Sequence, residues 1–159
     1  MNDTRDTADF PEPSIPLSPV ISSRSLTRHG INNNASLLDA RYRRNVTSGR
    51  AAIALALEKA GIHAGDEVLI PAFHCESMVS PIRWRKASAV FYQIHLDTTI
   101  DLSDIEARIT AQTKVVLATH YFGFMQDFRP LRKLCDQYNL IFIEDCAHAF
   151  FGSIDGVNV

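Results

Sequence analysis

Four short apolar runs, separated by segments of helical character, constrain the fold of this chain more than any other feature. They are EVLIP at residues 67–71, AVFYQI at 89–94, KVVLAT at 114–119 and LIFIE at 140–144. Strands that read as continuous apolar runs, instead of alternating apolar and polar residues, are typical of parallel sheets buried on both faces. The sequence therefore predicts an α/β fold with three layers, in which helices cover both faces of a mostly parallel central sheet.

Helices are expected around these strands. Thr47 or Ser48 can cap a first helix that runs through Leu57 and ends near Gly61, and its apolar character almost all round predicts burial. Further helices are predicted over residues 76–86, 101–109 and 128–138. The stretch of residues 1–25 carries four prolines among Ser, Thr and Asp, which predicts a disordered or extended leader.

Composition excludes several classes of protein. The 16 Lys and Arg residues against 18 Asp and Glu residues give a net charge of −2, so neither nucleic-acid binding nor membrane-surface binding is expected. The most apolar run, around residues 53–57, is far shorter than the roughly 20 residues that span a bilayer. Three cysteines without close pairing argue against a disulfide framework, and we expect a cytoplasmic protein.

Polar side chains follow three of the four predicted strands, at the edge where an open parallel sheet binds its ligand. They are His74 and Cys75 after the first strand, His120 and Tyr121 after the third, and Asp145, Cys146 and His148 after the last. A His or Cys at a strand end is more often packed and hydrogen-bonded than catalytic. The convergence of so many on one edge favours a binding site there.

Two of these features indicate a particular ligand chemistry. The segment Ser48-Gly49-Arg50-Ala51-Ala52 opens the first helix, where unpaired N–H groups suit a phosphate. Taken by itself, a Ser-Gly pair before a helix more often marks a simple N-cap at Ser48. Asp145 closes an apolar strand and is expected to be largely buried, so its carboxylate needs a cationic partner. The protonated ring nitrogen of a cofactor, a distant arginine and the N-terminus of a following helix are the alternatives.

The segments SGRAAIALAL, GDEVLIPAFHC, TKVVLATHYFG and EDCAHAFFG, in this order, resemble the DegT/DnrJ family of pyridoxal-phosphate-dependent sugar aminotransferases, which have fold type I. The resemblance covers about residues 45–156. It implies transfer of an amino group, usually from glutamate, to a nucleotide-linked keto sugar in amino-sugar and polysaccharide biosynthesis, by an enzyme that is a homodimer when complete. Residues 26–159 then correspond to the N-terminal portion of the large, cofactor-binding domain.

The resemblance also implies roles for individual residues. It places the cofactor phosphate at Gly49, Arg50 and Ala51, where the family commonly has threonine in place of the arginine. It pairs Asp145 with the protonated pyridine nitrogen and brings His148 near the phenolic oxygen of the cofactor. The family often stacks an aromatic ring on the cofactor at the position of Cys75, so either this thiol or the neighbouring His74 fills that role here. His120 and Tyr121 fall in a segment that lines the site.

One catalytic residue of the family has no counterpart in this sequence. The lysine that forms the Schiff base with the cofactor lies downstream of the EDCAHAFFG-like segment, and the lysines present are Lys59, Lys86, Lys114 and Lys133. These four are expected in helices or at a strand start, away from the site. We therefore expect a truncated large domain without the small domain, inactive alone and still able to bind the cofactor noncovalently.

Two readings from other classes remain open. A metal-dependent hydrolase could draw on the ligand pool His74, Cys75, His120, Asp145, Cys146 and His148, although no paired Cys-x-x-Cys or His-x-x-x-His motif is present. A noncatalytic half-domain could pair with another chain through basic clusters at Arg41, Arg43 and Arg44 and at Arg83, Arg85 and Lys86.

Overall fold

A computed structural model describes residues 36–154 and 157–158. The predicted leader, residues 1–25, lies outside the described residues. The central sheet has four parallel strands in the order β2-β1-β3-β4, which confirms the predicted α/β fold with a parallel sheet. The strands are β1 (Glu67–Pro71), β2 (Ser88–Tyr92), β3 (Thr113–Thr119) and β4 (Ile141–Asp145).

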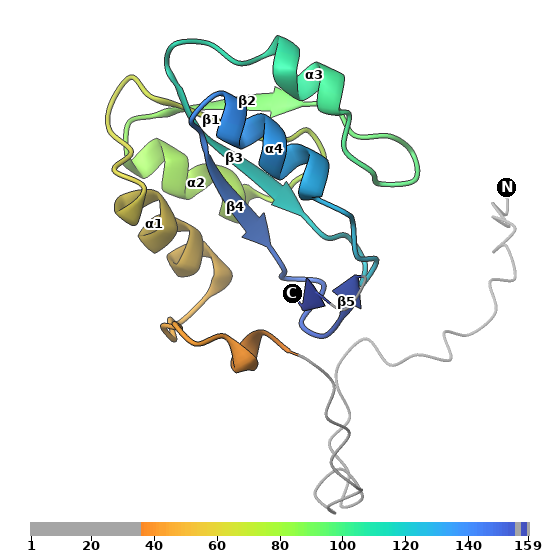
Figure 1. The fold of residues 1–159 in the computed structure, drawn as a ribbon. Coiled ribbons are helices and arrows are strands. Elements are labelled where there is room, and N and C mark those ends of the chain that lie inside the picture. Colours follow the sequence, from red (N-terminus) through yellow and green to blue (C-terminus); the bar gives the residue numbers. More distant parts are fainter. Residues whose placement is uncertain (1–35, 155–156, 159) are drawn as a thin grey trace, which may run out of the picture. The chain divides into compact units, whose positions relative to one another are not determined.

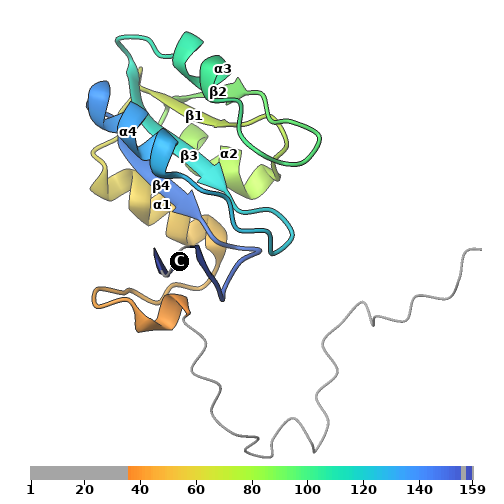
Figure 2. The same ribbon diagram turned by 45° about the vertical axis from the view of Figure 1, so that its right-hand side comes forward.

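Helices cover both faces of this sheet, as Figures 1 and 2 show. Helices α1 (Gly49–Lys59) and α2 (Glu76–Trp84) pack on one face, and α3 (Leu102–Ala107) and α4 (Arg129–Gln137) on the other. Successive side chains of the central strands contribute to opposite cores: Val68 and Ile70 of β1 contact the α1/α2 side, whereas Leu69 contacts the α3/α4 side. Burial on both faces is the physical reason for the continuous apolar runs.

The order of the strands creates a switch point. From β1 the chain passes outward to β2, which is one edge strand of the sheet. From β3 it passes outward to β4, which is the opposite edge strand. The carboxyl ends of β1 and β3 therefore lie side by side, with connections that leave them in opposite directions. In open α/β sheets this is the place where ligands bind.

The expected element boundaries are confirmed to within two residues, with one informative difference. The second strand ends at Tyr92, not at residue 94, because Ile94 leaves the sheet and forms an isolated antiparallel bridge with Ile100. The residues between them make a short hairpin ahead of α3. In this hairpin the amide of Thr98 donates a hydrogen bond to the carbonyl of His95.

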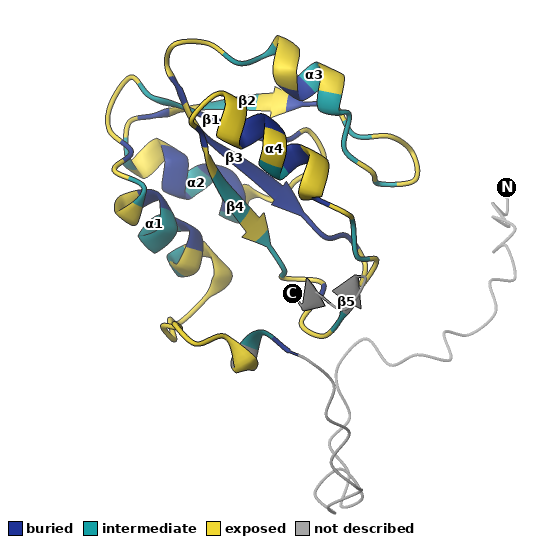
Figure 3. Ribbon diagram, in the orientation of Figure 1, coloured by how far each residue is buried: buried dark blue, intermediate teal, exposed yellow. Residues whose placement is uncertain are grey.

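The predicted burial of the first helix is wrong for this chain. Only Ile53 and Leu57 of α1 are buried, while Ala52 is exposed and its other apolar residues are partly covered (Figure 3). The helix lies on the outside of the sheet, so one face contacts the core and the other has no cover among the described residues. Small alanines leave that outer face apolar without placing it in the core.

Short elements flank the sheet. The 3-10 helix η2 (Leu37–Asp39) precedes α1, and a hairpin of β5 (Ser153–Ile154) and β6 (Val157–Asn158) follows β4. The amide of Leu37 donates to the carbonyl of Phe150, so the segment before α1 contacts the segment after β4. None of the helices among the described residues combines the length and apolarity needed to cross a membrane.

Candidate functional site

The loops that follow β1 and β3 are joined directly at the switch point. The Tyr121 hydroxyl donates a hydrogen bond of 2.6 Å to the carbonyl oxygen of Phe73, and the two rings lie 5.5 Å apart. Tyr121 is buried, and this burial raises the pKa of its hydroxyl to about 12, with the nearby Asp145 and Cys75 acting in the same direction. The phenol therefore stays protonated and keeps donating to Phe73, which holds the loops after β1 and β3 together.

The first turn of α1 lies on the side of the sheet where β3 and β4 end, as both views show (Figures 1 and 2). Ser48 is the N-cap, and its hydroxyl oxygen accepts a 3.2 Å hydrogen bond from the amide of Ala51. The amides of Gly49 and Arg50 make no hydrogen bond within the described part of the chain. A Cβ added at Gly49 would meet nothing within 4 Å, so the approach to these amides is open.

Asp145 ends β4 and is half-buried, so the expectation that it would be largely buried is wrong. The reason is that β4 is an edge strand, covered by β3 on one side only. Its Oδ1 accepts a 2.9 Å hydrogen bond from the amide of Ala147. Among the described residues no ion pair involves this carboxylate and no helix follows it, so neither alternative partner is present there.

His148 is exposed and presents a defined ring edge. Its Nδ1 accepts a 3.4 Å hydrogen bond from the amide of Phe122, and the two rings stack with centroids 5.7 Å apart. The proton of the neutral ring therefore resides on Nε2, which becomes a donor. Phe122 has a φ of 56°, a left-handed conformation that is costly for an aromatic residue and is often found at functional sites.

His74 and Cys75 are both exposed, and both have local partners. Nδ1 of His74 lies 3.0 and 2.9 Å from the carbonyl oxygens of Pro71 and Ala72, so it carries the ring proton. The imidazole stacks on Phe91 of β2, with centroids 4.8 Å apart and planes 13° from parallel. The sulfur of Cys75 lies 2.6 Å from the hydroxyl of Ser77. One face of the His74 ring is therefore already covered.

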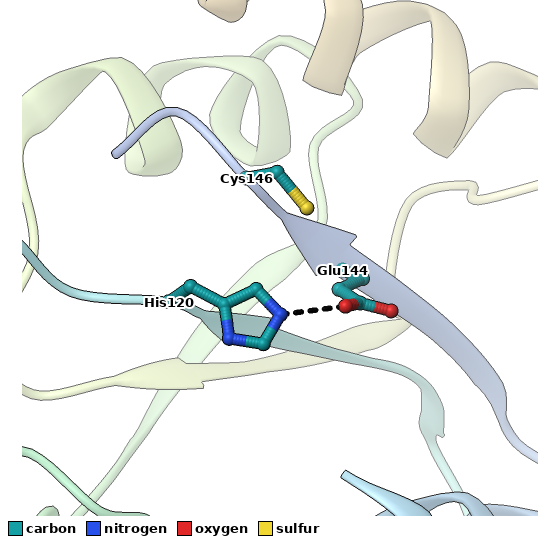
Figure 4. A group of neighbouring side chains, drawn as sticks. All are labelled: His120, Glu144 and Cys146. Carbon is teal, nitrogen blue, oxygen red and sulfur yellow. Dashed lines mark hydrogen bonds and ion pairs between the residues drawn. The ribbon is translucent and has the colours of Figure 1, made fainter. Parts of the chain in front are cut away.

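His120 is completely buried and holds the end of β3 to the end of β4. Figure 4 shows its ring directed at Glu144, with Nε2 2.6 Å from the carboxylate oxygen Oε1. Its Nδ1 accepts a 2.9 Å hydrogen bond from the amide of Gln126, and the ring stacks on Phe128 at 4.6 Å. Sequence reasoning did not select Glu144 or Gln126. The available signal was that Glu144 is the one charged residue in the apolar run LIFIE.

Ligand atoms of His120, Glu144 and Cys146 lie within 4.8 Å of one another. Of the six residues in the predicted metal pool, His120 and Cys146 are the two that belong to such a group among the described residues. To bind a metal through Nε2, His120 would need its proton on Nδ1, where it would face the amide N–H of Gln126. A metal-bound histidine normally donates its second N–H to an acceptor, and here a second donor stands in that place. Burial, with Glu144 and Asp145 nearby, also raises the pKa of Cys146 to about 12 and opposes a thiolate ligand.

The lysines lie away from the carboxyl edge. Lys59 ends α1, Lys86 follows α2 and Lys114 lies near the start of β3, all toward the opposite edge, while Lys133 lies within α4. Two members of the basic cluster Arg83, Arg85 and Lys86 have acidic neighbours, because Arg83 lies 3.9 Å from Glu76 and Arg85 lies 3.2 Å from Glu58.

Comparisons with known proteins agree on one family. The family model for the DegT/DnrJ/EryC1/StrS aminotransferase family matches residues 32–159. GDP-perosamine synthase of Vibrio cholerae is 35% identical over 126 residues, which are 79% of this chain and 34% of that protein. L-glutamine:2-deoxy-scyllo-inosose aminotransferase of Streptomyces kanamyceticus is 35% identical over 114 residues, 71% of this chain and 27% of that protein.

A solved structure gives the same result. NtdA of Bacillus subtilis, crystallised with bound cofactor PMP, superimposes with a TM-score of 0.61 at 31% sequence identity, covering 64% of this chain and 24% of that one. The chain spans about a third or less of the length of these proteins.

Proposed function

Because the chain belongs to the DegT/DnrJ/EryC1/StrS aminotransferase family, we propose that residues 26–159 form the N-terminal portion of the cofactor-binding domain of a pyridoxal-phosphate-dependent sugar aminotransferase. One observation carries the proposal. The Asp145 carboxylate, half-exposed and without an ion pair among the described residues, lies at the same sheet edge as the open first turn of α1. A ligand with a cationic ring and an anionic phosphate satisfies both.

The first turn of α1 fits the phosphate of the cofactor. The amides of Gly49 and Arg50 have no partner within the described residues, and the positive end of the helix dipole favours an anion. The amide of Ala51 already donates to Ser48, so it is a shared donor. The exposed guanidinium of Arg50 supplies a positive charge, which the threonine usual in the family lacks, together with several hydrogen-bond donors in place of one hydroxyl.

The remaining residues fit the ring. Asp145 holds a proton on the pyridine nitrogen, and the Nε2–H of His148 donates toward the phenolic oxygen. His74 or Cys75 borders one face of the ring, while Tyr121 and His120 line the site and hold its loops. When bound, pyridoxal 5'-phosphate supplies an electron sink for the carbanion formed at the reacting carbon.

For the whole protein we infer transfer of an amino group to a keto sugar carried by a nucleotide. The names GDP-perosamine synthase and L-glutamine:2-deoxy-scyllo-inosose aminotransferase support a sugar-type acceptor and a donor that is glutamate or glutamine. A homodimer is part of the same proposal. With none of the four lysines at the carboxyl edge, these 159 residues alone lack an amine to move the proton, which typically costs 10² to 10⁴-fold in rate.

Titration of the purified chain with pyridoxal 5'-phosphate tests the proposal. We expect saturable one-to-one binding, followed by absorbance, and no unique labelled lysine after borohydride reduction and peptide mapping. Asp145→Ala should weaken binding, whereas Asp136→Asn on the exposed side of α4 serves as the matched control and should not. Equal affinity of Asp145→Ala and wild type, or a stoichiometric adduct at one lysine, would contradict the proposal.

A further inference from the structure

His120 connects three segments that meet below the site. Its backbone amide donates a 3.1 Å hydrogen bond to the carbonyl of Asp145, and its Nε2 lies 2.6 Å from Glu144. Its Nδ1 accepts from the amide of Gln126 in the loop between β3 and α4. The side-chain amide of Gln126 in turn donates to the carbonyl of Thr119, the last residue of β3, at 2.8 Å. A single buried side chain thus joins the ends of β3 and β4 to a loop.

The hydrogen bonds define the state of the ring. A nitrogen that faces an amide N–H must offer a lone pair, so Nδ1 is unprotonated and Nε2 carries the proton. This Nε2–H donates to the Glu144 carboxylate, whose side chain is 40% exposed, whereas that of His120 is 1% exposed. The ring is therefore a fixed donor toward β4 and a fixed acceptor toward the loop.

The position of these bonds matters because β4 is an edge strand. The ladder between β3 and β4 ends at the pair Thr119 and Asp145, so nothing in the sheet holds the chain beyond that point. There His120 binds two consecutive residues: its Nε2 contacts the side chain of Glu144, and its backbone amide donates to the carbonyl of Asp145. Side chains of neighbouring strand residues point to opposite faces, so fixing Glu144 on one face orients the Asp145 carboxylate on the other.

We propose that His120 is a positioning residue, which aims the Asp145 carboxylate through its bond to Glu144. The proposal rests on the proposed function, because the role of Asp145 as the partner of the cofactor ring nitrogen comes from there. In metal sites, removing a residue that orients a ligand side chain typically lowers affinity or activity by about 10 to 100-fold, and we expect an effect of this order here.

Two substitutions separate the two sides of the ring. In the variant His120→Gln, the side-chain amide nitrogen reaches the place of Nε2 and can still donate to Glu144, but no side-chain atom accepts from Gln126. In the variant His120→Asn, the shorter side chain reaches only the place of Nδ1. Its amide oxygen can still accept from Gln126, but the hydrogen bond to Glu144 is lost. Both variants lose the stacking on Phe128 and one of the two ring hydrogen bonds. We expect similar losses of thermal stability from the two, so stability by itself does not separate them.

The cofactor-free readout is the amide resonance of Ala147, which donates to Oδ1 of Asp145 and so reports the orientation of that carboxylate. In the ¹⁵N-labelled chain of 159 residues, His120→Asn should shift this resonance, and His120→Gln should leave it near its wild-type position. With pyridoxal 5'-phosphate, His120→Asn should weaken binding by about 10-fold more than His120→Gln.

The outcomes are distinguishable. Equal effects of the two variants on the Ala147 resonance, or a larger effect of His120→Gln, would overturn the positioning role whether or not cofactor binds. A wild-type ring with its proton on Nδ1, seen in long-range ¹H–¹⁵N spectra, would overturn it as well. Failure of the wild-type chain to bind pyridoxal 5'-phosphate would instead contradict the proposed function, while the resonance of Ala147 still decides the positioning role.

Discussion

At the scale of single residues, the site is defined by which atom of each side chain is already engaged. The three histidines of the site show this clearly. Nδ1 of His74 donates to backbone carbonyls, whereas Nδ1 of His120 and of His148 accepts from a backbone amide. The exposed Nε2 of His74 is therefore an acceptor, whereas the Nε2 of His148 carries the ring proton and is a donor. His120 is engaged on both nitrogens and serves the protein, while His148 has a free Nε2–H available to a ligand.

The three cysteines should differ sharply in reactivity toward alkylating reagents, because two of them are shielded from water and one is exposed. Burial raises the pKa of Cys146 to about 12 and that of Cys135 to about 11, while Cys75 is exposed. Since the thiolate is the reactive form, alkylation by iodoacetamide at about pH 8 should modify Cys75 at least about 10-fold faster than the other two. The alkylation rate of Cys146 should keep increasing with pH well above pH 9, because its thiolate fraction grows until the pH reaches its pKa of about 12.

Mass spectrometry of tryptic peptides over time measures these rates. In Cys75→Ser the fast phase should disappear, and in urea all three wild-type thiols should react at similar rates. A fast phase that persists in Cys75→Ser would show that Cys146 or Cys135 is ionised in the folded chain, against the environment described above.

At the scale of elements, α1 begins with a side-chain cap followed by amides that no described residue contacts. Ser48 accepts a hydrogen bond from the amide of Ala51, whereas the amides of Gly49 and Arg50 have no partner within the described residues. Only two residues of the helix are buried, so little packing energy holds its first turn. The helix therefore depends more on its cap than a fully buried helix does.

Removal of this cap should be measurable in the free chain. Ser48→Ala should lower the free energy of unfolding by about 0.5 to 2 kcal/mol, because the amide of Ala51 loses its partner. Ser48→Thr keeps a hydroxyl acceptor and should stay close to wild type. Urea unfolding followed by circular dichroism gives both values. If Ser48→Ala matches Ser48→Thr, the cap contributes nothing and the first turn is held by other contacts.

At the scale of the whole described unit, apolar surface gathers where β3 and β4 end. Phe122, Phe124, Phe150 and Phe151 are between 42% and 70% exposed. At the other end of the edge strand β4, its first residue, Ile141, is 44% exposed. No strand of the described residues pairs with the outer side of β4. An open parallel edge with apolar side chains pairs readily with other chains, so this surface favours self-association.

A charge on that edge should reduce self-association. Ile141→Lys places a lysine on the outer strand, a substitution that discourages edge-to-edge pairing. Gln137→Lys adds the same charge on α4 and serves as the control. Sedimentation velocity at increasing concentration should show less association for Ile141→Lys than for wild type and Gln137→Lys. Equal association of all three would indicate that the β4 edge is not the contact.

The sequence by itself determined that the fold has a parallel sheet, the order of its elements along the chain, and the edge at which the polar residues gather. Apolar runs and helix signals are local, so their periods could be read without knowing which strands are neighbours. Strand boundaries came within two residues, and Ser48 was one of two predicted caps. The family resemblance also came from local segments in order, and the matching family model confirms it.

Tertiary structure alone decided how far each element is buried and which side chains meet. Asp145 and α1 are more exposed than their sequences predict, because β4 is an edge strand and α1 packs with one face only. The bond from His120 to Glu144 joins residues 24 positions apart, so it depends on the pairing and register of β3 with β4. Partners across a sheet follow from strand order, which no local pattern encodes.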